Sequence, residues 1–89
     1  MKAIVTVIGK DQVGIIAAVC IKLANYNVNV LYISQTVMQG YFTMMMVVDV
    51  SSCTIPLAQL CVDMEEMGKE KGLTIRVQRE DIFEAMHRI

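Results

Sequence analysis

The spacing of apolar positions changes several times along the 89-residue chain, and each spacing predicts a different element. Residues 2–8 are rich in β-branched side chains and predict a strand that ends at Gly9. From residue 13 to residue 26, apolar side chains recur every three or four positions, which predicts a helix. Because this helix is apolar nearly all round, we expect it to be covered on more than one side.

Two long apolar runs follow and predict a hairpin. Residues 28–38 and 41–50 have the character of strands, and Gln39-Gly40 between them supplies a two-residue turn. The even positions of the second strand are all apolar, and the opposite face is still largely apolar. That opposite face consists of Tyr41, Thr43, Met45, Val47 and Asp49. Since a strand with one solvated face alternates more cleanly, we expect this face to be covered as well, by a partner subunit.

An amphipathic helix is predicted after a loop at residues 51–54. Its apolar stripe consists of Leu57, Leu60, Cys61, Met64 and Met67. We expect Thr54 to cap its start, Pro56 to lie in its first turn and Gly72 to end it in the left-handed conformation.

The last part of the chain predicts a strand and a short helix. Residues 73–79 alternate strictly between apolar and polar, which is typical of a half-exposed edge strand. Residues 81–88 predict a short helix with one apolar side. That side consists of Ile82, Phe83 and Met86.

The predicted order of elements is β-α-β-β-α-β. Two βαβ-like halves with right-handed crossovers predict an α+β fold, the ferredoxin-like sandwich. Its antiparallel sheet has the strand order 4-1-3-2 and carries both helices on one face. We expect one domain over residues 1–89, with a core at 1–79 and a C-terminal helical extension at 80–89.

Composition adds a prediction of self-association. The apolar fraction is 55%, above the usual share of about 45–50%, and a small domain hides such a surplus by pairing with other copies. The net charge of −1 offers no electrostatic footprint for nucleic acid, and no apolar run reaches the length that spans a bilayer. The N-terminus does not have the pattern of a signal peptide. We therefore expect a cytoplasmic homodimer or higher homo-oligomer without nucleic-acid or membrane partners.

Candidate catalytic and metal-binding groups are sparse. The three cysteines include no C-x-x-C pair and the single histidine, His87, is distant from them, so neither a disulfide framework nor a metal site is predicted. We expect Cys20 and Cys61 to be small core residues. No G-x-S-x-G motif occurs, and the acidic residues of the second helix have the pattern of a solvated face. We therefore predict that the protein is not an enzyme and needs no cofactor.

The loop "GKDQVG" at residues 9–14 is the strongest candidate for a binding site. A helix N-terminus offers free N–H groups and a partial positive charge to a carboxylate, and Asp11 offers its carboxylate to an ammonium group. Gly14 permits close approach of backbone or ligand. Such a site suits a free amino acid. The alternative is an ordinary turn between strand and helix, capped by Asp11 or Gln12.

At this loop and the strand that follows the helix, the chain resembles the ACT domain, the small-molecule regulatory module of amino-acid metabolism. The resemblance is carried by a D-x-x-G-I element at Asp11–Ile15 and an N-V-N-V element at Asn27–Val30. Their order and spacing within the βαββαβ pattern extend it over residues 1–79. The chain looks similar to stand-alone bacterial and archaeal members, which are related to the tandem glycine cleavage repressor type.

The resemblance implies a non-catalytic domain that pairs with a second copy and binds an amino acid between the two. The family's binding loop falls on Asp11, Gln12, Val13, Gly14 and Ile15, and its second-strand contact falls on Asn29 with Val30 beside it. Many members carry proline where this chain has Val13. No enzyme domain lies within these residues, so the sequence does not say which protein the module regulates.

An alternative hypothesis is a structural or protein-interaction adaptor without a small-molecule ligand. Such an adaptor docks on a partner through an exposed strand edge or through the C-terminal helix, with Ile82, Phe83 and Met86 as its contact surface.

Overall fold

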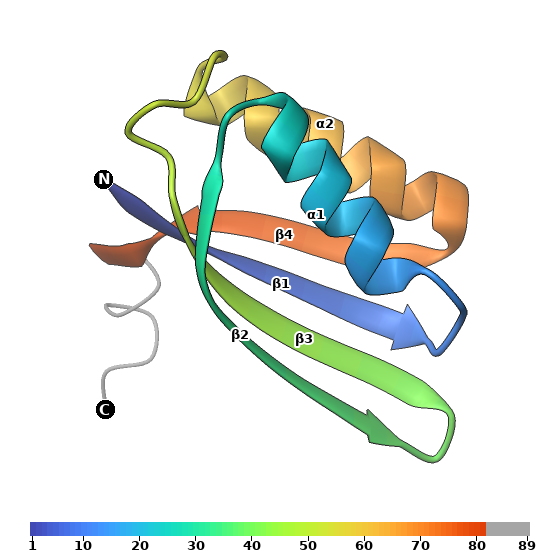
Figure 1. Ribbon diagram of the computed structural model, residues 1–89. Coiled ribbons are helices and arrows are strands. Elements are labelled where there is room, and N and C mark those ends of the chain that lie inside the picture. The colour runs from blue at the N-terminus through green and yellow to red at the C-terminus, as the bar shows by residue number, and fades with distance from the viewer. Residues whose placement is uncertain (82–89) are drawn as a thin grey trace.

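The computed structural model describes residues 1–81, in which four strands form one sheet and two helices cover one of its faces (Figure 1). The elements are β1 (Lys2–Lys10), α1 (Ile15–Asn25), β2 (Asn29–Met38), β3 (Tyr41–Asp49), α2 (Leu57–Lys71) and β4 (Leu73–Arg79). The strand order is β2-β3-β1-β4, and all neighbours pair antiparallel. The predicted ferredoxin-like sandwich, with its order 4-1-3-2, is therefore confirmed.

The hydrophobic core lies between the sheet and the two helices. Alternate residues of β3 point into it, beginning with Phe42 and Met44, as the sequence pattern predicted. The helices contribute one stripe each. The buried members of these stripes are Ile15, Val19 and Leu23 from α1 and Leu60, Met64 and Met67 from α2. Cys20 and Cys61 are free thiols that are partly buried against this core.

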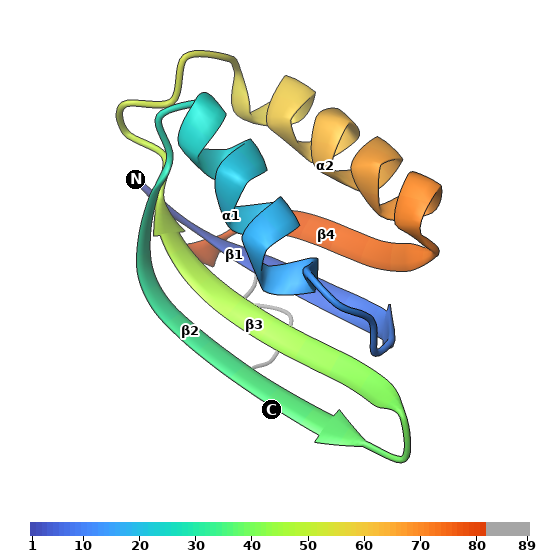
Figure 2. The ribbon, with the colours of Figure 1, turned by 45° about the vertical axis from the view of Figure 1, so that its right-hand side comes forward.

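The opposite face of the sheet remains open at several apolar positions. Both helices lie on the same side of the sheet, as Figure 2 shows. Tyr32, Tyr41 and Met45 are exposed, and the register places all three on the face away from the helices. The largely apolar second face predicted for β3 is therefore present, and these side chains are not covered within residues 1–81.

The junction between β1 and α1 differs from the prediction. The strand does not end at Gly9 but continues to Lys10, because Gly9 is paired with Phe42 on one side and Leu73 on the other. The helix begins at Ile15 rather than at residue 13. Gly14 is its N-cap in the left-handed conformation, with φ of 85°, so the expectation of an Asp11 or Gln12 cap is wrong.

The turns elsewhere mostly follow the prediction. Gln39 and Gly40 both have positive φ, as a two-residue hairpin turn requires. Gly72 ends α2 in the left-handed conformation, with φ of 71°. The expectation that Thr54 caps α2 is wrong, because the extended residue Pro56 is the N-cap.

The predicted C-terminal helix at residues 81–88 lies outside the described residues except for Asp81. The same holds for its apolar side, Ile82, Phe83 and Met86. Asp81 itself pairs with Arg79 at the end of β4, with 2.6 Å between Oδ2 and Nη2. Over residues 1–81, neither helix combines the length and the apolarity that crossing a bilayer requires.

Candidate functional site

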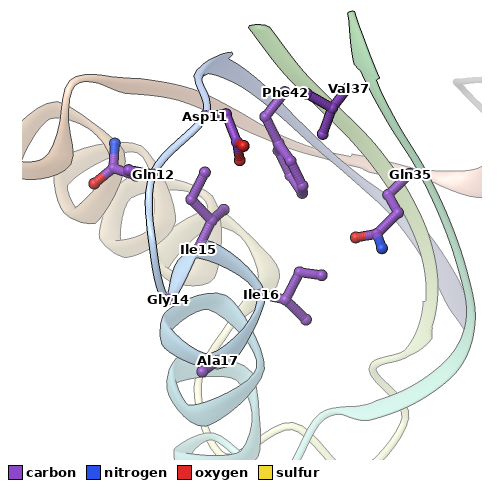
Figure 3. Close-up of a pocket in the computed structure, with 9 residues that line it drawn as sticks. All are labelled: Asp11, Gln12, Gly14, Ile15, Ile16, Ala17, Gln35, Val37 and Phe42. Carbon is purple, nitrogen blue, oxygen red and sulfur yellow. The ribbon is translucent and has the colours of Figure 1, made fainter. Parts of the chain in front are cut away.

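A hollow of about 400 Å³ lies between the loop after β1, the start of α1 and the strands β2 and β3 (Figure 3). Its lining consists of Asp11, Gln12, Gly14, Ile15, Ile16, Ala17, Gln35, Val37 and Phe42. The edge strand β2 is exposed along nearly all of its length. Because the helices leave this strand uncovered, the hollow opens toward the edge of the sheet.

The loop that borders the hollow is held at two points. The Asp11 N–H donates to the Gly40 carbonyl at 2.8 Å, which ties the loop to the turn between β2 and β3. The Gln12 side chain donates through Nε2 to the Lys71 carbonyl at 2.9 Å, which ties the loop to the end of α2. In Figure 3 the Gln12 amide accordingly points away from the hollow, whereas the Asp11 carboxylate points toward Phe42. Gln12 therefore anchors the loop, and Asp11 supplies the negative charge.

The start of α1 supplies hydrogen-bond donors to the hollow. The Ala18 N–H donates to the Gly14 carbonyl at 2.9 Å, and this is the bond that opens the helix. The N–H groups of Ile15, Ile16 and Ala17 precede it and have no acceptor within the helix. Such groups, together with the helix dipole, favour an anion. One hollow thus combines donors for a carboxylate with a carboxylate that accepts from an ammonium group.

A hydrogen-bonded clip at the other end of α1 fixes the two helices against each other. The Tyr26 hydroxyl donates to Asp63 Oδ2 at 2.6 Å, and Gln59 Nε2 donates to Asp63 Oδ1 at 2.7 Å. These two hydrogen bonds, chiefly the one from Tyr26, lower the pKa of Asp63. The same bond to Asp63 raises the pKa of Tyr26. The clip therefore links the C-cap residue of α1 to α2.

The structure brings together only part of the predicted binding set. Asp11, Gln12, Gly14 and Ile15 line the hollow, whereas the side chain of Val13 is fully exposed and does not line it.

Asn29 and Val30 stand at the beginning of β2. Asn29 is eight positions before Val37, or about 25 Å along the strand. It borders a separate hollow of about 360 Å³. The lining of that second hollow is Ala24, Asn27, Val28, Asn29 and Ser52. Within one subunit, Asn29 and Val30 are therefore distant from the loop.

Five lining residues lie outside the predicted binding set: Ile16 and Ala17 from α1, Gln35 and Val37 from β2, and Phe42 from β3. Alternation along β2 places Gln35 and Val37 on one face, but it does not say which part of the molecule they meet. The register decides this, since Val37 pairs with Phe42 and Phe42 pairs with Gly9, next to the loop.

Metal ligands do not gather here. Across residues 1–81, no group of three or more Cys, His, Asp or Glu is placed to hold a metal ion.

Comparison with known proteins places this chain in a family. Residues 2–78 match the family model of the ACT domain. A UPF0237 protein of Bifidobacterium longum is 52% identical over 88 residues, which are 99% of this chain and 98% of that protein. The structure of an ACT domain protein from Streptococcus pneumoniae is 45% identical, with a TM-score of 0.82 and 98% of each chain covered.

A more distant structure, named for a glycine cleavage system transcriptional repressor, shares the fold. It is 17% identical, with a TM-score of 0.74, and the match covers 86% of this chain and 44% of that one. The family model and the nearly full-length relatives confirm the resemblance that the loop and the second strand carried. This chain belongs to the ACT domain family.

Proposed function

We propose that this ACT domain is a non-catalytic regulatory module that binds an amino acid at the interface of a homodimer. The observation that supports it most strongly is the hollow beside α1, because it offers groups that can bind both the positive and the negative charge of a small zwitterion. Its ammonium group would pair with Asp11, and its carboxylate would accept from the first N–H groups of α1. The family is regulatory and not catalytic, which agrees with this function.

The exposed edge of β2 supports pairing of two copies. An edge strand presents a row of N–H and C=O groups that lack a strand partner, and β2 presents this row over ten residues. Apolar side chains accompany it, since Ile33 is 37% exposed and Val37 is 54% exposed. Two β2 strands that pair antiparallel about an axis at Ile33, near the middle of β2, would satisfy the backbone groups and cover these side chains.

This pairing would also reunite the predicted binding set. In an antiparallel pair, each step away from the axis along one strand is matched by a step along the other. The start of the partner subunit's β2, which carries Asn29 and Val30, would therefore lie beside residues 35–37, next to the hollow that Gln35 and Val37 line. The Asn29 and Val30 contacts would then come from the partner, and a bound ligand would stabilise the dimer by its higher affinity for that arrangement.

Amino-acid binding is tested by thermal unfolding of the full chain in the presence of each common amino acid. A ligand at about 100 times its Kd stabilises the folded state by about 2.7 kcal/mol, which is readily measured. Asp11→Asn keeps the shape of the side chain and removes its charge, so we expect it to abolish the shift. Glu66→Gln, on the exposed side of α2, is the matched control and should keep the shift.

Two outcomes would contradict this proposal at different points. If no amino acid raises the unfolding temperature, the protein is not an amino-acid sensor. If Asp11→Asn retains the full shift, a ligand binds but the ammonium contact is elsewhere.

The exposed β2 edge by itself favours a second function, an adaptor that docks strand to strand on another protein without a small ligand. This function predicts partner binding that is insensitive to amino acids and to Asp11→Asn. A charged residue on β2 should weaken the same binding. Measuring partner affinity with and without amino acids separates the two functions.

We also place the module in the cytoplasm. Its three cysteines are free thiols, and such thiols persist where reducing systems operate. Fractionation of cells that express the full chain tests this placement.

A further inference from the structure

We propose that Gln35 selects the side chain of the ligand, and that the ligand is an uncharged amino acid whose side chain carries a hydroxyl or amide group. This inference rests on the proposed function, because it takes the ammonium and carboxylate groups of the ligand to lie at Asp11 and the start of α1. It adds the class of side chain that the remaining part of the hollow accepts.

The layout of the hollow gives the ligand a direction. Asp11 lies at one end, bonded through its N–H to Gly40 in the turn between β2 and β3. Val37 and Phe42 form the next pair along these strands. Gln35 is two positions farther from the turn, or about 7 Å along β2. A ligand held at the loop therefore extends its side chain past Phe42 toward the Gln35 amide (Figure 3).

Gln35 is a polar residue in apolar surroundings. Its neighbours on the same face of β2 are Ile33 and Val37, and its register partner Met44 is fully buried. No residue within 1–81 forms a hydrogen bond with the Gln35 side chain, and water solvates it because the residue is exposed.

A ligand and a partner subunit would remove that water. The amide then needs a new partner, since a polar group that loses water without one carries a desolvation cost. A hydroxyl or amide on the ligand supplies the partner, and an aliphatic side chain of the same shape does not. Sites that hydrogen-bond their substrate discriminate strongly against analogues that lack the bonding group.

Charged side chains fit this end of the hollow poorly. Asp11 is the single charged residue in the lining, and it lies at the loop end. A charged group beside Gln35 would be enclosed next to Val37 and Phe42 without a counter-ion, which is costly. The volume of about 400 Å³ is near the lower end of the range for ligand pockets, about 300–1,000 Å³, and favours a small ligand.

The experiment compares amino acids of matched shape by titration calorimetry on the full-length protein. Threonine against valine, and glutamine against methionine, each differ in hydrogen bonding at nearly constant size. We expect the polar member of at least one pair to bind about tenfold more tightly to the wild type. Gln35→Met removes the amide at constant length and should abolish this preference. Thr36→Val, on the opposite face of the same strand, is the control and should preserve it.

Equal binding within both pairs, or a preference that survives in Gln35→Met, overturns the role of Gln35 and leaves amino-acid sensing in place. If no amino acid binds to the wild type, both proposals fall. The wild-type comparison decides the ligand class by itself if the Gln35→Met variant does not fold.

Discussion

At the scale of single residues, the hydrogen bond between Tyr26 and Asp63 makes stability depend on pH. Its effect on Asp63 is to lower the carboxyl pKa below the ordinary value of 3.8. A lowered folded-state pKa contributes stability above the ordinary pKa, and this contribution is lost as the pH falls through the folded-state value.

We therefore expect Tyr26→Phe to lower the unfolding temperature at neutral pH, and the difference from wild type to narrow under acid conditions. Thermal unfolding followed by circular dichroism from pH 7 to strong acid measures this. Tyr41→Phe, at an exposed position of β3, is the control and should show no such narrowing. A Tyr26→Phe difference that is constant with pH would contradict the mechanism.

At the scale of elements, the close approach of α2 to β4 depends on Gly68. A Cβ at this buried position would lie 2.8 Å from the Leu73 carbonyl oxygen and 3.0 Å from Ile75 Cγ1. Alanine normally favours a helix over glycine by about 1 kcal/mol, whereas overpacking costs about 1–3 kcal/mol. The contact with a backbone oxygen makes the net effect of alanine on stability unfavourable, because the backbone cannot rotate away as a side chain does.

We expect Gly68→Ala to lower the free energy of unfolding by about 1 kcal/mol, the remainder after the gain in helix propensity. Urea unfolding measures the change through the midpoint concentration. A midpoint that rises would contradict this expectation. It would show that the gain in helix propensity exceeds the cost of overpacking, because α2 can shift on β4.

At the scale of the whole molecule, residues 1–81 leave two of their own surfaces uncovered: the edge of β2 and the apolar positions on the open face of the sheet. If β2 pairs with a second copy about its middle, a charge at Ile33 is placed close to the same charge on the partner. We expect Ile33→Lys to weaken dimer formation at least tenfold, the equivalent of about 1.4 kcal/mol. Sedimentation velocity over a concentration series measures this.

Val62→Lys provides the matched control, because Val62 is an exposed apolar residue of α2, away from β2. It should leave association unchanged. A wild-type chain that sediments as a monomer at high micromolar concentration would contradict the homodimer, and equal weakening by both substitutions would contradict the β2 interface.

Local sequence accounts for most of the fold but for less of the candidate site. The alternation at Phe42, Met44 and Met46 correctly predicted which face of β3 is buried, and Gly72 correctly predicted the end of α2. The cap of α1 could not be predicted in the same way. Asp11 has the right chemistry for an N-cap, but its backbone is bonded to Gly40, so the helix starts later at Gly14.

The sequence by itself determined the type and order of the elements, the faces they bury and the Asp11–Ile15 loop as a candidate site. This was possible because the direction of a side chain follows the local backbone period. Only the tertiary structure decided that Gln35 and Val37 lie beside this loop and that Asn29 lies at the far end of β2. Strand register and helix placement depend on contacts between residues that are distant in sequence, such as Gly9 with Phe42, and no local pattern encodes them.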